Sequence, residues 1–399
     1  MTVTATTPES RTPPKGPGAG YWVKKNLFNS VFDSILTIVF GLLALYVVFR
    51  VALFVFVNGR WEIIQANLKL LMVGRWPSEE LMVISVSLSV IGLWGGIIAG
   101  LIAARQIRVG TSAASGMSVA QRSSDLVRRF GLIMGAILLL LLLTSTSGPW
   151  ITTLFMLVST LVGYWVGRVL GRLTLARWLV RVGVLVLLVA PIAVFFYLTS
   201  AVPLAEWEGF LFNMTSAAAG IVLSFPIGVL LALGRRSKLP LLKSVSIVYI
   251  EFVRGSPLFV LLLLANVSLE FFVPAALAPS KVVRAIVTFT IFTASYIAEI
   301  VRGGLQSVPR GQEEAAKALG LSPTKQMFRI VMPQALRNVI PAQIGQFISL
   351  FKDTTLAGAA LGILDLLAAG EAITQQPDFR GQGLIIESLV FVAFLFWVG

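Results

Sequence analysis

The sequence predicts an all-α protein, a polytopic transmembrane helical bundle. Of its 399 residues, 57% are hydrophobic and only 13% are charged, about half the charge of a soluble chain. Apolar runs long enough to cross a bilayer core, which takes roughly 20 helical residues, recur along the chain. The basic residues, which give a net charge of +14, cluster between these runs, as they do in the cytoplasmic loops of membrane proteins.

The apolar runs predict ten spans. The first is longer than the apolar core of a cleaved signal peptide, so it is expected to be retained. Residues 1-30 are expected to form a disordered cytoplasmic tail, residues 31-205 an N-terminal block of about five spans, and residues 206-399 a core of five more. The ten spans are 31–52, 81–103, 130–146, 150–167, 182–200, 210–233, 244–266, 282–301, 337–352 and 383–399.

The positions of the basic clusters predict the orientation of the chain. The clusters follow the even-numbered spans, which predicts that both termini lie in the cytoplasm. The connection 53–80 is an exception, since it carries basic residues on the predicted outer side. Its mixed pattern with Trp61 and Trp76 predicts an amphipathic helix lying at the membrane interface.

The composition also excludes several classes of function. The chain has no Cys and no His, which excludes disulfides, thiolate or imidazole metal sites and Ser-His-Asp triads. It has no Gly-x-x-x-x-Gly-Lys-Ser/Thr loop, so no ATP site of that kind is expected. The basic residues flank apolar runs, so they favour a membrane over nucleic acid. No metal and no bound cofactor are predicted.

The connection 303-337 is unlike an ordinary loop. A good helix former with acidic residues near its start ends at Gly320. Ser322 and Pro323 are typical of the start of a second short helix, and Pro333 is expected to end it. The two helices are predicted to stand at an angle in the cytoplasm, with three small residues on one compact face: Ala315, Ala316 and Ala318.

This spacing resembles the EAA motif of ABC importer permeases. The matching residues are Glu314, Ala315, Ala316, Gly320, Ile330 and Pro333. Met332 stands where leucine is usual, a swap that conserves volume. The resemblance implies that the helix pair docks in a cleft of a separate ATPase. The alternative is an amphipathic helix pair that rests on the lipid surface.

Three further segments, 251–258, 294–304 and 351–356, look like signatures of the polar amino acid permease family. The long N-terminal block makes the chain resemble the larger permease subunit of general L-amino acid ABC importers. The resemblance implies that 206-399 is a type I ABC importer permease core with a coupling loop at 303-337. Because family members usually continue past the last span into a basic tail, we expect Gly399 to end a shortened form.

The resemblance also implies partners and a location. The chain would translocate amino acids across the bacterial cytoplasmic (inner) membrane as a multi-pass protein and would not itself be an enzyme. ATPase subunits would use ATP-Mg, a second and different permease subunit would complete the path, and a periplasmic binding protein would deliver the substrate. The sequence does not indicate which amino acids are carried.

Polar residues inside or at the ends of spans are the candidates for the substrate path, because an amino acid carries both signs of charge. They are Ser295, Glu299, Lys352, Asp353 and Thr354. Each has a structural alternative: Glu299 could form an i,i+3 ion pair with Arg302, Lys352 could extend to the outer surface, and Asp353 could cap the next segment.

Gly255 and Pro257 predict a bend in the seventh span. Such a bend would suit a gate, although packing alone could require it. Three other classes of protein stay open: an ATP-independent secondary transporter or channel, a membrane-anchored assembly factor and a membrane enzyme. They account for the composition but give no reason for the pattern from Glu314 to Pro333.

Overall fold

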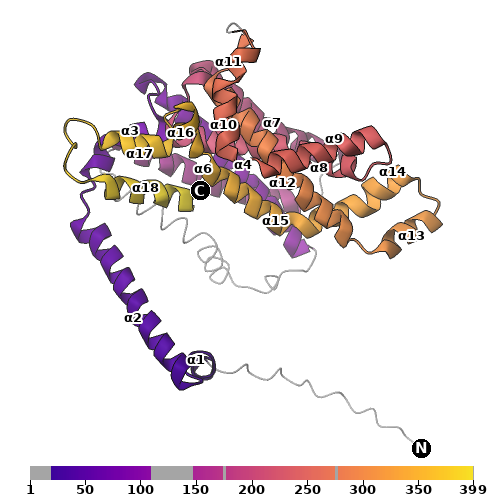
Figure 1. Ribbon diagram of the computed structural model, residues 1–399, viewed down its shortest axis with the longest axis horizontal. Helices are drawn as coiled ribbons and strands as arrows, with labels where there is room; N and C mark the ends of the chain where they lie inside the picture. Colours follow the sequence, from indigo (N-terminus) through magenta and orange to yellow (C-terminus); the bar gives the residue numbers. More distant parts are fainter. Residues whose placement is uncertain (1–18, 109–146, 174–176, 275–276, 399) are drawn as a thin grey trace, which may run out of the picture. The chain divides into compact units, whose positions relative to one another are not determined.

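The computed structural model describes residues 19–108, 147–173, 177–274 and 277–398 (Figure 1). In these ranges the regular structure is helical, with one isolated bridge between Gly209 and Asp365. The helices are α1 (Ala19–Leu27), α2 (Val31–Leu53), α3 (Glu62–Val73), α4 (Leu81–Arg108), α6 (Ser147–Arg172), α7 (Arg177–Ala201), α8 (Gly209–Arg235), α9 (Pro240–Gly255), α10 (Leu258–Val267), α11 (Leu269–Phe272), α12 (Lys281–Ser307), α13 (Arg310–Ala318), α14 (Pro323–Gln326), α15 (Met332–Asp353), α16 (Leu356–Leu361), α17 (Leu366–Ile373) and α18 (Ile385–Val398). Short 3-10 turns cover Ser78–Glu80 and Leu204–Glu206, and π turns cover Phe54–Asn58 and Met327–Val331.

The chain divides into two compact units, residues 1–60 and 61–399. The first unit contains α1 and α2, and the second contains all the later helices. The expectation that residues 1-30 form a disordered tail was wrong for Ala19–Leu27, which is the helix α1, because the prolines of this segment all precede Ala19; residues 1–18 lie outside the described residues. The predicted N-terminal block 31-205 is therefore divided, since α3, α4, α6 and α7 belong to the same compact unit as the core helices. The functional boundary at 205 stays a prediction.

Helix α2 has the properties of a lipid-facing span. Ser30 is its N-cap and accepts a hydrogen bond from the backbone N–H of Asp33 at 3.0 Å. No residue of α2 is buried, although the helix is apolar on every side. A helix that is apolar all round is stable only in an apolar surrounding, so α2 needs lipid or another protein around it.

Nine of the ten predicted spans coincide with helices, and the third, 130–146, lies outside the described residues. Within the described ranges, five helices are long and apolar enough to cross a membrane, and six if the bent pair α9–α10 forms one span. Helix α15 is longer than the predicted 337–352 and contains Pro341. It carries several amide side chains, which lower its hydropathy.

Helices α4 and α6 pack backbone to backbone through glycines. A Cβ on Gly96 would overlap the carbonyl oxygen of Thr160, and one on Gly167 would overlap the carbonyl oxygen of Ile97. The same relation recurs one turn away along both helices, at Gly92, Gly100 and Gly163. Glycines spaced by four allow two membrane helices to approach this closely, so any side chain here would separate them.

The centre of the second unit is the bundle of α8, α12 and α15. Helix α12 packs against both other helices, and its residues Phe289 and Ile297 are fully buried. Gly228 of α8 lies against Ile297. A Cβ atom built on Gly304 of α12 would lie 2.7 Å from the carbonyl oxygen of Ala335. Small residues thus bring the three helices together around one core.

Helix α3 is amphipathic as predicted, but its apolar face is covered by protein. Ile63, Ile64 and Leu71 are fully buried and pack with residues of α17 and α18. The Nε2 of Gln376 donates a 2.7 Å hydrogen bond to Oδ1 of Asn67. The prediction of a helix resting on the membrane interface was therefore wrong about its apolar partner, because α17 and α18 supply a surface that the local pattern does not reveal.

Candidate functional site

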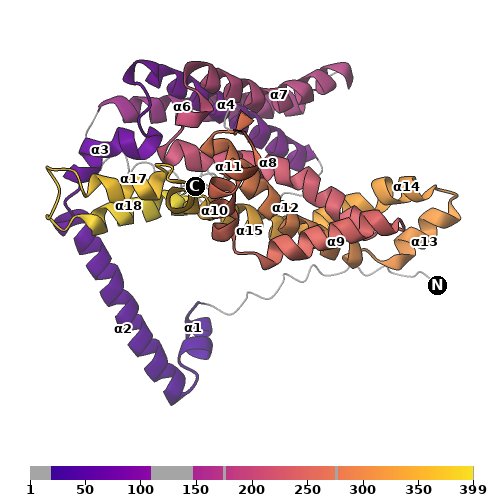
Figure 2. The same ribbon diagram turned by 45° about the horizontal axis from the view of Figure 1, so that its top comes forward.

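The helix pair predicted at the cytoplasmic side is present as α13 and α14 (Figures 1 and 2). Gly320 follows α13 with φ +71°. The N–H of Gly320 donates to the carbonyl of Lys317 at 3.0 Å, and the N–H of Leu321 donates to that of Ala316 at 3.2 Å. This pair of bonds is a Schellman motif, which requires a left-handed residue and favours glycine. The turn between the two helices is therefore fixed by backbone geometry.

The predicted end of the second helix at Pro333 was wrong. Helix α14 starts with Pro323 at its first turn, as expected, and then continues through the π turn Met327–Val331 into α15. Pro333 lies in the first turn of α15. A proline ring lacks an N–H and clashes with the carbonyl four residues before it. The wider π turn changes the hydrogen-bond partners just there, so the chain remains helical.

The outward face of the pair is exposed and partly apolar. Ala316 is buried, whereas Glu314, Ala315, Ala318 and Gly320 are exposed. The three alanines therefore do not share one face, because residues 315 and 318 point to one side of α13 and residue 316 to the other. Ile330 is half-buried and Pro333 is exposed. Two large apolar side chains are exposed beside them: Leu319 (80%) and Phe328 (57%).

The base of the pair is held by the bundle. Leu305 in the last turn of α12 and Val308 directly after it pack with Val331, Met332 and Ala335 in one buried cluster. Three polar links add to this packing: Asn338 donates to Ser307 at 3.0 Å, Gln334 donates to Gln312 at 3.4 Å, and Arg236 lies 3.7 Å from Glu313. A force applied to the exposed end of α13 would therefore reach the ends of α8, α12 and α15.

A cluster of charges joins α8, α9 and α12 at the same end of the bundle. Glu299 accepts hydrogen bonds from Arg302 at 2.7–3.0 Å and from Arg235 at 3.0 Å, and Arg254 lies 3.9 Å away. Arg235 also donates to Glu251 at 2.8 Å. The geometry thus shows the structural alternative for Glu299, an ion pair with Arg302. The pair is part of a larger cluster of charges than the sequence predicted.

The five candidates for the substrate path do not come together in this chain. Leu350 of α15 and Phe289 of α12 both lie next to Gly220, so these two residues are at the same height along the bundle. Glu299 is ten residues further along α12, which is about 15 Å at 1.5 Å per residue, and Lys352 follows Leu350 in the opposite direction. Ser295 is buried and donates to the carbonyl of Phe292 of its own helix. Lys352 is exposed and Asp353 is half-buried.

Thr354 belongs to a buried polar cluster with Asn213 and Asp365. Thr354 accepts from Nδ2 of Asn213 at 2.9 Å, and Oδ1 of Asn213 accepts from the N–H of Leu366 at 2.9 Å. Asp365 is the N-cap of α17, accepting from the N–H groups of Ala368 and Gly358 at 2.8 Å each. Burial raises the pKa of Asp365 to about 6. This cluster fastens α8 to the segment between α15 and α17, so the structure favours a structural role for Thr354.

The predicted bend in the seventh span is present and is sharper than a kinked helix. Gly255 ends α9, Pro257 precedes α10, and the two helices meet at 100°. A Cβ on Gly255 would touch nothing within 4 Å, so packing does not require glycine there. A role for Gly255 and Pro257 as a gate stays a prediction.

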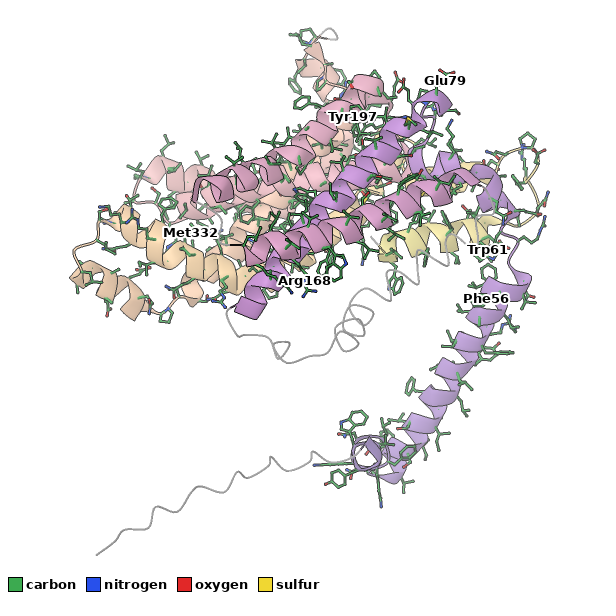
Figure 3. The ribbon with its side chains drawn as sticks, turned by 180° about the vertical axis from the view of Figure 1, so that it is seen from behind. Phe56, Trp61, Glu79, Arg168, Tyr197 and Met332 are labelled. Carbon is green, nitrogen blue, oxygen red and sulfur yellow. The ribbon has the colours of Figure 1, made fainter. Side chains whose placement is uncertain are left out.

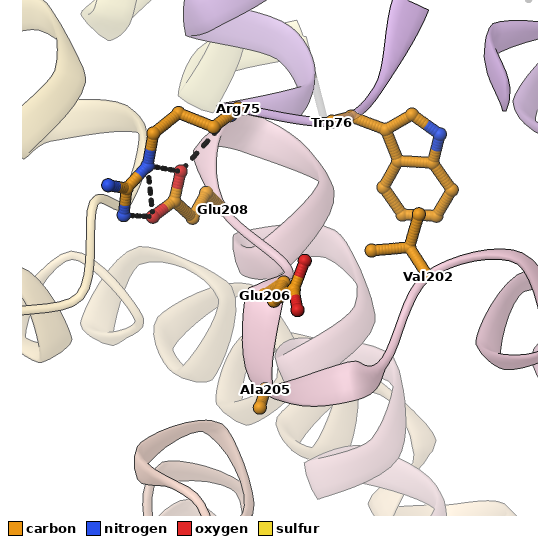
Figure 4. A pocket seen from close by; sticks show the side chains of 6 residues that line it. All are labelled: Arg75, Trp76, Val202, Ala205, Glu206 and Glu208. Atoms are coloured by element: carbon orange, nitrogen blue, oxygen red, sulfur yellow. Dashed lines mark hydrogen bonds and ion pairs between the residues drawn. The ribbon is translucent and has the colours of Figure 1, made fainter. Parts of the chain in front are cut away.

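At the opposite end of the second unit, Arg75 is joined to Glu208 (Figure 4). Figure 3 places Glu79 and Tyr197 toward this end, and Arg168 and Met332 toward the other. The hydrogen bond to Glu208 raises the pKa of Arg75 above its ordinary value. The pair borders a cavity of about 380 Å³, which lies between the segment after α3 and the connection from α7 to α8.

Several of these residues were missed by reasoning from the sequence. Arg235 lies on α8, Glu251 and Arg254 lie on α9, and Glu299 lies on α12, so no local pattern connects the three helices. A polar Asn213 inside an apolar span is a detectable signal, because such residues are expensive in a membrane. In the described part of the chain, no group of three or more acidic side chains lies close enough to hold a metal ion.

The fold and the site define a class: a multi-span membrane protein with a helical projection held at one end of the bundle. Residues 224–399 match the family described as "Binding-protein-dependent transport system inner membrane component". The chain belongs to this family, and it is therefore a multi-pass inner-membrane protein. This confirms the resemblance inferred from the EAA pattern and the predicted all-α permease fold.

Three curated relatives show the extent of the similarity. The glutamate/glutamine/aspartate/asparagine transport system permease protein BztC of Rhodobacter capsulatus is 43% identical over 50% of this chain and 48% of that protein. The inner membrane amino-acid ABC transporter permease protein YhdY of Escherichia coli is 38% identical over 51% of this chain and 54% of that protein. The probable glutamine ABC transporter permease protein GlnP of Bacillus subtilis is 37% identical over 43% of this chain and 76% of that protein. The chain thus spans about half the length of the first two relatives.

Proposed function

We propose that this chain is a membrane-spanning permease subunit of an ATP-driven importer of amino acids. A separate ATPase binds α13 and α14. When the ATPase changes conformation, the base of this helix pair transmits the movement to the bundle. The observation that carries the proposal is the pair of exposed apolar side chains Leu319 and Phe328, one before and one after the Gly320 turn, whose backbone hydrogen bonds fix its geometry. Exposed large apolar side chains on a polar projection mark a docking surface.

The proposed substrate class rests on the relatives. BztC, YhdY and GlnP carry names that refer to amino-acid transport, and the family description refers to a binding protein. In this proposal the chain binds no cofactor, and ATP-Mg is used by the partner ATPase. A periplasmic binding protein delivers the substrate, a second and different permease completes the path, and the N-terminus lies in the cytoplasm. The alternative, ATP-independent transport, leaves the exposed tip without a partner.

Cysteine crosslinking tests the docking directly, since the chain has no cysteine of its own. Ala318→Cys places a thiol on the outward face of α13, and Ala316→Cys places one on the buried face as a matched control. In membranes that contain the whole transporter, we expect Ala318→Cys to capture an ATPase subunit and Ala316→Cys to capture little. Capture of lipid alone by both variants would overturn the proposal.

Gly320→Val tests the transmission of force. A β-branched residue at φ +71° is strained by about 1–2 kcal/mol, so the turn should deform. We expect amino-acid uptake to fall at least about tenfold while ATP hydrolysis continues. The matched control is Gly183→Val, because Gly183 lies in α7 with nothing within 4 Å of a built Cβ and without a positive φ. Normal uptake by Gly320→Val would count against coupling through this turn.

A further inference from the structure

Helix α1 is an aromatic and basic helix that the described residues of the first unit leave uncovered. It precedes the first span, and every residue from Gly20 to Ser30 is exposed. Tyr21 and Trp22 are exposed at 59% and 57%, and Lys24 and Lys25 lie in its last turn. Exposed Trp and Tyr side chains beside lysines are typical of the boundary between lipid and water, because each ring has an apolar body and one polar group.

The junction with α2 fixes where α1 can lie. The hydroxyl of Thr37, in the second turn of α2, donates a 2.7 Å hydrogen bond to the carbonyl of Leu27 at the end of α1. Figures 1 and 2 show α1 turned sharply away from the axis of α2. Because α2 is long and apolar enough to cross the membrane, a helix held against its first turns at such an angle lies along the membrane surface.

The two faces of α1 suit that position. At 100° per residue, Lys24 and Lys25 fall on the same side as Tyr21, while Val23 and Leu27 fall on the opposite side. Helices with this pattern lie in the interfacial layer with their apolar side about 5–10 Å deep. The acidic residue in the described part of the first unit is Asp33, in the first turn of α2, so Lys24 and Lys25 give this end of the unit an excess of positive charge.

We propose that α1 is an interfacial anchor that binds acidic phospholipid headgroups through Lys24 and Lys25. The chemistry is that of two ammonium groups beside phosphate oxygens, with Trp22 and Tyr21 set among the headgroups. The anchor holds the start of α2 at a fixed depth in the bilayer. It acts whether or not the chain couples to an ATPase.

The absence of cysteine allows a single label on α1. Val23→Cys, carrying an environment-sensitive fluorophore, reports whether the apolar side of α1 is in lipid. The full-length chain is reconstituted into vesicles of phosphatidylcholine alone or with phosphatidylglycerol, both leaflets having the same composition. The access of acrylamide, a neutral quencher, to the label is then measured in two proteins. One retains both lysines, and the other carries Lys24→Gln and Lys25→Gln together.

We expect the label to be shielded in the anionic vesicles at low salt. Replacing both lysines should shift the ratio of shielded to exposed label about 30-fold toward exposed, since each basic residue near an anionic surface contributes about fivefold. About 1 M salt should have the same effect, because it shortens the Debye length to about 3 Å. Lys238→Gln, on the exposed connection between α8 and α9, removes a positive charge elsewhere and should leave the ratio unchanged.

Equal shielding in neutral and anionic vesicles would overturn the proposal. So would shielding that occurs only when other transporter subunits are present, because a protein would then cover α1. Neither result depends on transport, so a failure here is distinguishable from a failure of the coupling proposed for α13.

Discussion

Arg235 of α8 donates a 3.0 Å hydrogen bond to Glu299 of α12, although the two residues are 64 positions apart in the chain. Arg302 approaches the same carboxylate from its own helix. The side chain of Glu299 is only 16% exposed, whereas that of Glu251, the other acceptor of Arg235, is 56% exposed. Glu299 is therefore the acceptor on which the charge cluster converges.

Glu299→Gln should loosen this end of the bundle. The amide has one acceptor oxygen and no charge, so the arginines around it lose their compensation. We expect a loss of about 1–3 kcal/mol in stability, measured as a lower thermal unfolding midpoint of the purified protein. Glu251→Gln serves as the control, with an expected cost below about 1 kcal/mol for an exposed pair. If the two substitutions lowered the unfolding midpoint equally, Glu299 would contribute no more to the stability of the charge cluster than Glu251.

Gly96 and its neighbour Gly95 offer a matched pair for testing the packing of α4 on α6. A Cβ on Gly96 would overlap the backbone of Thr160, whereas one on Gly95 would meet nothing within 4 Å. We expect Gly96→Ala to destabilise the protein by about 1–3 kcal/mol through overpacking. Gly95→Ala should be neutral or slightly stabilising, because alanine is the better helix former. The same thermal unfolding assay compares them, and identical midpoints would contradict the close contact.

Asp365 should make stability depend on pH. Burial raises its pKa to about 6 from an ordinary value of 3.8, so between these values the folded protein retains a proton that the unfolded chain has lost. Its contribution to stability therefore falls as the pH rises through that window and is constant above it. Two pKa units correspond to at most about 3 kcal/mol.

Asp365→Asn should remove this slope from a series of unfolding midpoints measured between pH 4 and pH 7. Asp378→Asn, on the exposed connection after α17, should leave the slope in place. An unchanged slope in Asp365→Asn would mean that another group titrates in this range.

Lys352 and Asp353 should separate from Thr354 in a comparison of uptake with stability. Lys352→Gln and Asp353→Asn should lower uptake about tenfold or more while the complex still assembles. Thr354→Val should instead lower the thermal midpoint, because Asn213 loses its acceptor. Ser349→Ala, on an exposed position one turn earlier, is the control. Unchanged uptake in the first two variants would remove them from the path.

The sequence was sufficient where the structure depends on neighbouring residues. The α13–α14 turn follows from Gly320 and Pro323, since a Schellman end and a first-turn proline are local rules. Pro333 shows the limit of such rules. The buried residues Val331, Met332 and Ala335 pack against α12, and this packing keeps the helix continuous through a π turn.

Contacts between distant segments could not be predicted from one sequence. Asn213 reaches Thr354 across 141 positions and Leu366 across 153, and no spacing rule links them. The glycines at 92, 96 and 100 are a visible signal, because their period of four is typical of helix contacts in membranes. The sequence does not indicate which helix these glycines contact. The structure shows that they contact α6, where Gly163 and Gly167 lie against α4 in return.

The hydrogen bond between Asn67 and Gln376 spans 309 positions, and this separation sets an order of events during synthesis. At roughly 5–20 residues per second, a ribosome that has just made α3 needs about 15–60 s more to reach the residues that cover it. During that interval Ile63, Ile64 and Leu71 lack the cover that α17 and α18 provide in the folded chain. A nascent α3 therefore exposes part of its apolar face until α17 and α18 emerge.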